Sequence, residues 1–77
     1  MNTNEFLAGV MRIVTETKNS PVWKMFETKF ANDTKKEKFV ELVSSKVFAT
    51  YKKEIVANPA ILDVTKVEIE SYVKMNF

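Results

Sequence analysis

Apolar residues recur every three or four positions through residues 36–57, a stretch that contains neither glycine nor proline. These residues are Phe39, Val40, Val43, Val47, Phe48, Tyr51 and Ile55. At about 100° per residue, this spacing covers roughly half of the circumference of a helix. Because such a wide apolar stripe needs neighbours on more than one side, the pattern predicts one unbroken helix at the centre of a small bundle.

Residues 2–18 carry a narrower apolar stripe that predicts a second helix. Its members are Phe6, Leu7, Val10, Met11, Ile13 and Val14. Asn2 followed three residues later by Glu5 is typical of a capped helix start, in which the Asn2 side chain accepts an otherwise unpaired backbone N–H. Gly9 is the single glycine of the chain and costs about 1 kcal/mol relative to alanine inside a helix. Gly9 is either simply tolerated at this cost or marks the close approach of another helix, and the close approach is preferred.

A short aromatic helix is expected between these two. Ser20 suits the N-cap and Pro21 the first helical position, where the missing N–H of proline costs nothing. One face then carries Val22, Trp23, Phe26 and Phe30, with Met25 at its edge. At helical spacing, such aromatic residues are expected to lie in the core rather than in a ligand groove. The pattern stops at residues 32–33, and Thr34 with Glu37 forms a capping box that predicts the start of the central helix.

The last part of the chain supports two interpretations. Proline restricts the residue before it, so residues 58–59 are expected to end the central helix, with an apolar connector over residues 60–64. Beyond it, the odd positions Val67, Ile69, Val73, Met75 and Phe77 are apolar, which is the alternation of a strand. Thr65 and Glu68, however, form a second capping box, with a hydrophobic staple between residues 64 and 69, which favours a helix. Helix is preferred, and a strand paired with a second copy is the alternative.

Together these elements predict an all-α fold: a small bundle of three to four helices around one long central helix, as a single domain over residues 1–77. Apolar residues make up 45% and charged residues 29% of the chain, which is ordinary for a globular domain. Cysteine and histidine are both absent, so neither disulfides nor strong zinc ligands are available. A chain of 77 residues without such internal cross-links is expected to gain stability from a protein partner or from a second copy of itself.

The back of the central helix carries a basic flank with a thin apolar line. Lysines lie along it at Lys35, Lys38, Lys46 and Lys53. Leu42, Ala49 and Val56 follow one another at intervals of seven residues within this flank. A heptad-spaced apolar line bordered by lysine is typical of a helix that docks on a partner with acidic flanks. These seven residues are the predicted partner-binding site.

The residues present exclude several kinds of chemistry. Serine has no histidine base beside it, no glycine-rich loop is available for phosphates, and paired carboxylates such as Glu68 and Glu70 point to different sides of a helix. We therefore expect no enzymatic activity, no cofactor and no metal site. No apolar run reaches the ~18 residues of a membrane span, and residues 6–14 do not resemble a signal peptide. The chain is expected to be complete from Met1 and cytoplasmic.

These observations favour a small non-enzymatic protein-binding module, a regulator, inhibitor or assembly factor that covers the surface of a partner protein. Compact lysine-rich chains of this kind also occur among accessory proteins of phages and mobile elements. The alternative is a nucleic-acid-binding protein that uses the lysine flank. The break before residue 34 resembles a helix-turn-helix connection, but the following residues, Lys35 to Lys38, lack the Arg, Asn or Gln that pairs base edges. The net charge of +2 is also small for a nucleic-acid binder.

Overall fold

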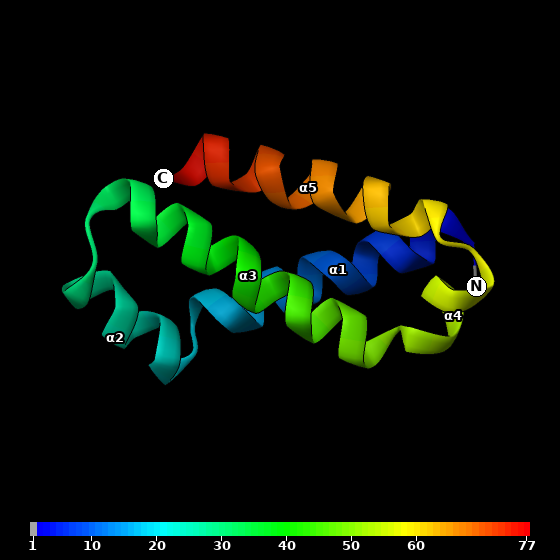
Figure 1. Cartoon of the computed structure of the whole chain (residues 1–77), viewed down its shortest axis with the longest axis horizontal. Coiled ribbons are helices and arrows are strands. Elements are labelled where there is room, and N and C mark those ends of the chain that lie inside the picture. The colour runs from blue at the N-terminus through cyan, green and yellow to red at the C-terminus, as the bar shows by residue number, and fades with distance from the viewer. Residues whose placement is uncertain (1) are drawn as a thin grey trace.

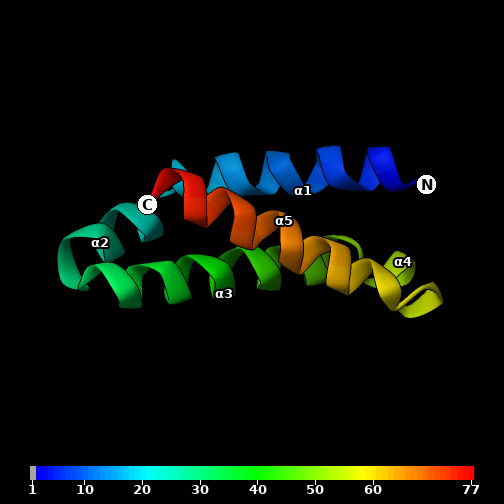
Figure 2. The same ribbon diagram turned by 90° about the horizontal axis from the view of Figure 1, so that it is seen from above.

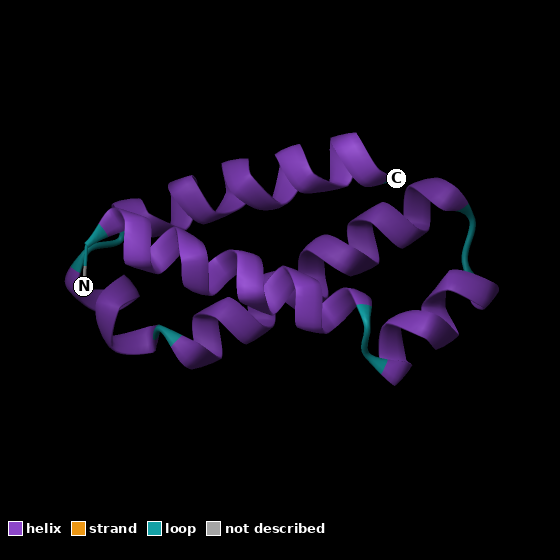
Figure 3. Ribbon diagram, turned by 180° about the vertical axis from the view of Figure 1, so that it is seen from behind, coloured by secondary structure: helices purple, strands orange, loops and turns teal. Residues whose placement is uncertain are grey.

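The computed structural model describes residues 2–77 and is built from helices joined by short connections (Figures 1 and 3). In chain order these are α1 (Thr3–Lys18), α2 (Pro21–Lys29), α3 (Asn32–Thr50), α4 (Lys52–Ala57) and α5 (Ala60–Asn76). No strand occurs within residues 2–77, so the all-α prediction is confirmed and the alternative of a C-terminal strand is wrong.

The three long helices form the body of the bundle. Figure 2 shows α1 and α5 running side by side in the same direction, with α3 running the opposite way. Each of the three packs against the other two, and α2 folds back along one end of α3. Their facing stripes bury the core residues Phe6, Val10, Ile13, Val14, Trp23, Phe39, Val43, Val47, Ile55, Ile69 and Val73.

The first two helices begin where the sequence predicts. The Asn2 side chain accepts a hydrogen bond from the Glu5 backbone N–H at 2.8 Å, and its amide donates to the Glu5 carboxylate at 3.2 Å. At α2, the Ser20 hydroxyl accepts from the Trp23 N–H at 3.2 Å, and Pro21 is the first helical residue. These local caps satisfy N–H groups that the helix itself leaves unpaired.

The central helix is not one unbroken rod. It stops at Thr50, and Tyr51 adopts φ −114° and ψ 30° before α4 starts in a new direction (Figure 1). The prediction of a continuous helix over residues 36–57 is therefore wrong. Ile55 gives the physical reason, because twelve residues of straight helix would place it about 120° away from Val43. The break instead turns Ile55 into the core, where it is 3% exposed.

The Tyr51 side chain fixes this break against α1. Its ring meets Phe6 edge-on, with centroids 5.1 Å apart, and its hydroxyl lies directly over Gly9. The expected close approach at Gly9 is thus made by a tyrosine at the end of α3. Phe48, which the predicted stripe included, remains 46% exposed.

Two predicted capping boxes do not form. α3 already begins at Asn32 after Ala31, with no side-chain cap, so Thr34 and Glu37 lie within the helix. α5 begins at Ala60, and the expected connector over residues 60–64 is its first turn. Thr65 is buried inside the helix, where its hydroxyl donates to the Ile61 carbonyl at 2.9 Å.

The aromatic helix contributes one side chain to the core in full. Trp23 is buried, with its ring centroid 4.9 Å from that of Phe39 and 5.4 Å from that of Phe77. Phe26 and Phe30 are half-buried and pack on each other at 5.3 Å. Val22 and Met25 are exposed, so the predicted aromatic core holds for Trp23 and only in part for its neighbours.

Candidate protein-binding surfaces

The predicted partner-binding residues divide between two helices. Lys35, Lys38, Leu42, Lys46 and Ala49 share one flank of α3, whereas Lys53 and Val56 belong to α4. Leu42 is half-buried and packs against the core, while Val56 is well exposed. Because the chain changes direction at Tyr51, the line from Leu42 through Ala49 does not continue straight to Val56. The predicted continuous strip is therefore wrong, although five of its seven residues still share a flank.

Two of these lysines make contacts within the chain. Lys38 Nζ lies 3.6 Å from the Glu41 carboxylate and 6.0 Å from the centre of the Phe30 ring. Lys35 is half-buried and lines a hollow of about 200 Å³ with Trp23 and Phe77. The exposed cations left on the flank are Lys46 on α3 and Lys53 on α4.

A second surface, which the sequence analysis did not identify, lies on the parallel helices α1 and α5. Its apolar residues are Leu7 and Met11 of α1 with Val64, Val67 and Met75 of α5, and we call it the α1–α5 face. Val67 is 61% and Met75 84% exposed, Met11 and Val64 are exposed by more than a third, and Leu7 is half-buried. These side chains stand outside the core although they belong to the two helices that build it.

Contacts at both ends show how α1 and α5 are aligned. Near their amino-terminal ends, Thr3 and Phe6 of α1 line the same hollow as Val64 of α5. At the other end, Lys18 Nζ lies 5.5 Å from the centre of the Tyr72 ring and 5.8 Å from that of Phe77. Residues that are 54 to 61 positions apart therefore lie at nearly the same level, which puts the middle of α1 beside the middle of α5.

Two rows of uncharged residues, one on each helix, make up the α1–α5 face. The α1 row consists of Asn4, Leu7, Ala8, Met11 and Thr15, and the α5 row of Ala60, Val64, Val67, Ser71 and Met75. Within each row, residues three or four positions apart lie on the same side of the helix. Lys18 ends the α1 row with its ammonium against Tyr72 and Phe77, and the half-buried Glu68 lies at the inner margin of the α5 row.

Charged residues form the two outer margins of this face. Glu5 and Arg12 are seven residues apart on α1, and Asp63 and Lys74 are eleven apart on α5. At 100° per residue, each pair lies within about 20° around its helix, just outside the uncharged row. All four side chains are exposed. Uncharged rows with charged residues along their outer margins are typical of a protein–protein interface, in which the polar residues form the rim.

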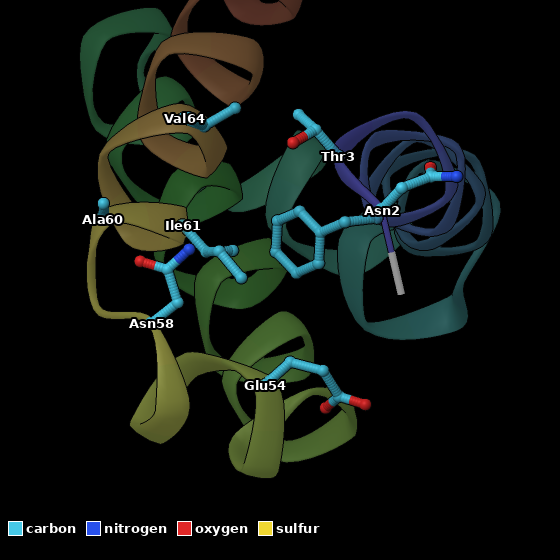
Figure 4. A pocket seen from close by; sticks show the side chains of 8 residues that line it. Asn2, Thr3, Glu54, Asn58, Ala60, Ile61 and Val64 are labelled. Atoms are coloured by element: carbon cyan, nitrogen blue, oxygen red, sulfur yellow. The ribbon is translucent and has the colours of Figure 1, made fainter.

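One end of the α1–α5 face opens into a hollow that residues of α1, α4 and α5 line together. It has a volume of about 280 Å³ and is lined by Asn2, Thr3, Phe6, Glu54, Asn58, Ala60, Ile61 and Val64. Figure 4 shows the Ile61 side chain toward its middle, with Glu54 and Asn58 at its margin. Because Phe6, Ile61 and Val64 line this hollow, it continues the apolar surface at this end of the face.

Comparisons of the chain with protein-family models, with curated proteins and with solved structures find no match. Within residues 2–77, no three or more metal-ligating side chains gather at one place. None of the helices that the structure describes is both long and apolar enough to cross a membrane. The candidate site is therefore defined by the exposed surface alone.

Proposed function

We propose that this chain is a small non-enzymatic protein-binding module that acts by covering the surface of another polypeptide with its α1–α5 face. The observation that carries the proposal is the uncharged double row on α1 and α5 with its exposed apolar side chains. Contiguous apolar surface rimmed by polar residues marks interaction sites in proteins. Binding would bury Val67 and Met75, which add nothing to the core of the free chain.

The surface area of the chain supports the same proposal. A compact monomer of 8.9 kDa is expected to expose about 4,800 Å², whereas this chain exposes 5248 Å². Its radius of gyration is 12.5 Å, against about 11.5 Å for a compact domain of this length. The bundle is thus long and thin, and a partner along its side would lower its exposed surface.

The proposal assigns no catalytic role to the chain. Without histidine or cysteine, the sequence lacks the most common general base and the thiol nucleophile. Its effect on a partner would be steric, by masking a surface or by stabilising one conformation of that partner. A few anchoring side chains would supply most of the affinity.

Photo-crosslinking from single positions tests this function. A benzoylphenylalanine at Val67 lies in the middle of the α1–α5 face, and one at Val56 lies on α4 with a similar exposure, 61% against 69%. In cells that express the chain, we expect a discrete cross-linked polypeptide from position 67 and none from position 56. Equal yields from the two positions, or no product from position 67, would contradict the proposed use of this face.

A further inference from the structure

We infer that the polypeptide covering the α1–α5 face is a second copy of the chain, an inference that rests on the proposed function. The two copies are related by a two-fold axis, so that α1 packs antiparallel to α1 of the other copy and α5 packs antiparallel to α5 of the other copy. A two-fold interface must be self-complementary, because the same patch is presented by both subunits. The charges at the margins of the face meet this condition.

The charges along the outer margin of α1 are complementary to those of a second α1 helix that runs in the opposite direction. Glu5 and Arg12 lie symmetrically about the midpoint between residues 8 and 9. An antiparallel α1 pair centred there places Glu5 of one copy opposite Arg12 of the other, and Arg12 opposite Glu5. A parallel pairing of the same helices would instead place like charges opposite each other.

The outer margin of α5 is also self-complementary in charge when the helix is reversed, and its midpoint lies near the midpoint of the α1 pair along the bundle. Asp63 and Lys74 lie symmetrically about the midpoint between residues 68 and 69, sixty residues beyond the midpoint of the α1 pair. The structure aligns the two helices near this offset, because Thr3 lines a hollow with Val64, 61 residues further on, and Lys18 Nζ lies over the rings of Tyr72 and Phe77, 54 and 59 residues further on. One axis therefore serves both helices and produces four opposite-charge pairs.

The centre of the face permits close contact of two copies. Ala8 and Ser71 are small residues near the axis, so the helix layers can approach each other. Val67 and Met11 can be buried against the uncharged residues of the two rows, whereas an ionised group buried there without a partner would be costly. The half-buried Glu68, at the inner margin of the α5 row, is the charged side chain that lies at the level of the axis. Packing of rows with spacings of three and four gives the shallow crossing of about 20° that is typical of four-helix bundles.

The size of the face sets the expected affinity. Helices of 16 and 17 residues are about 25 Å long, and two neighbouring helices present a width of about 18–20 Å. Two copies then bury roughly 1,000 Å², which is at the lower limit for a specific interface. A dissociation constant in the micromolar range is therefore expected.

Sedimentation equilibrium measures this association directly. We expect the average mass of the wild-type chain to rise from 8.9 kDa toward about 18 kDa as its concentration is raised from about 1 to about 500 μM, a range that includes the expected micromolar dissociation constant. Val67→Glu, and independently Met75→Glu, should weaken dimerisation at least about tenfold, because they bury a charge in the apolar row. Val56→Glu is the matched control and should leave it unchanged. Circular dichroism at 1 μM checks that each variant is folded.

Charge reversal tests the antiparallel arrangement specifically. Arg12→Glu places Glu against Glu in a homodimer, and Glu5→Arg places Arg against Arg, so each variant alone should be mostly monomeric at low salt. An equimolar mixture should dimerise again, because each contact then joins opposite charges. The effect should diminish in 0.5 M salt, which screens exposed charges.

The possible outcomes separate this inference from the proposed function. A wild-type chain that stays at 8.9 kDa at 500 μM overturns the self-association, and so does dissociation by Val56→Glu with Val67→Glu still dimeric. Failure of the mixture to restore the dimer overturns the antiparallel arrangement. If the chain is monomeric but position 67 still cross-links to a different protein, the inference fails while the proposed function stands. If it is monomeric and nothing cross-links, both fail.

Discussion

The contact between Tyr51 and Gly9 can be tested by substituting alanine at position 9. An alanine Cβ built there would overlap the Tyr51 hydroxyl oxygen and would lie 2.7 Å from its Cζ atom and 3.3 Å from its Cε2 atom. The tyrosine ring would therefore have to move away from α1. Because Tyr51 holds the junction of α3 and α4, this single methyl group probes the break in the central helix.

Two opposing effects determine the free energy change of Gly9→Ala. Alanine gains about 1 kcal/mol over glycine inside a helix. Against this stand an overpacking cost of about 1–3 kcal/mol and the edge-on contact of Tyr51 with Phe6, worth about 0.5–1.5 kcal/mol. Tyr51 is half-buried and can swing outward, so the lower part of these ranges applies. We expect a net destabilisation of about 1 kcal/mol, or about 4–8 °C in the melting temperature.

A double-mutant cycle with Tyr51→Ala isolates the contact. Once the ring is gone, Gly9→Ala should stabilise the chain by about 1 kcal/mol through helix propensity alone, giving a coupling energy of about 2 kcal/mol. Urea unfolding followed by circular dichroism, at a protein concentration where the chain is monomeric, measures all four species. Ala8→Gly is the control, because Ala8 is exposed and the change should cost about 1 kcal/mol in either background. If Gly9→Ala stabilises the wild type and the Tyr51→Ala variant equally, the tyrosine does not rest on Gly9.

Three other outcomes follow from the same structure. Ile55→Ala should destabilise the chain by about 2–5 kcal/mol, because the turn into α4 buries Ile55. Val56→Ala, at an exposed position, should cost less than about 0.5 kcal/mol. If urea unfolding gives equal effects for the two variants, the helix runs on unbroken. Asn2→Ala should cost about 1 kcal/mol through loss of the α1 cap, measured as a lower melting temperature, and no change would mean that this hydrogen bond contributes nothing in solution. Titration of labelled duplex DNA at 50 mM salt should give no saturable binding, because the basic flank is interrupted at Tyr51 and Lys38 is paired with Glu41. Binding that weakens steeply as salt is added, and that Lys46→Glu abolishes, would instead support the nucleic-acid alternative.

Local chemistry made several parts of the fold predictable. The caps at Asn2 and Ser20 depend on residues three positions away, and such short-range signals are complete within the sequence. The core stripes of α1 and α3 follow the same logic, since helical spacing alone brings Val10 and Val43 inward. The close approach at Gly9 was also predictable, because an interior glycine is costly unless a neighbour uses the space.

The break at Tyr51 depends on tertiary packing and had no local signal. Residues 50–52 contain no glycine or proline, so no strong helix breaker marks this position. The turn is favoured only because Ile55 reaches the core and the tyrosine finds Phe6 and Gly9 on another helix. For the same reason, the heptad line from Leu42 to Val56 could not be recognised as interrupted.

The apparent strand alternation of residues 67–77 had a different origin. Ile69 and Val73 face the core of a helix, while Val67 and Met75 belong to the α1–α5 face. Two apolar faces on one helix add together to give apolar residues at nearly every second position. The alternation on which the strand alternative was based therefore came from these surplus apolar residues, which lie on the proposed binding surface.

The single tryptophan of the chain reports on the assembly of three separate segments. The ring of Trp23 from α2 packs against those of Phe39 from α3 and Phe77 after α5, which also pack on each other and are 16 and 54 residues further along the chain. Its fluorescence therefore changes only when these distant segments come together, whereas far-ultraviolet dichroism follows the formation of each helix by itself. Stopped-flow refolding recorded with both signals can thus separate, in time, the coiling of the helices from the closure of the aromatic end of the bundle.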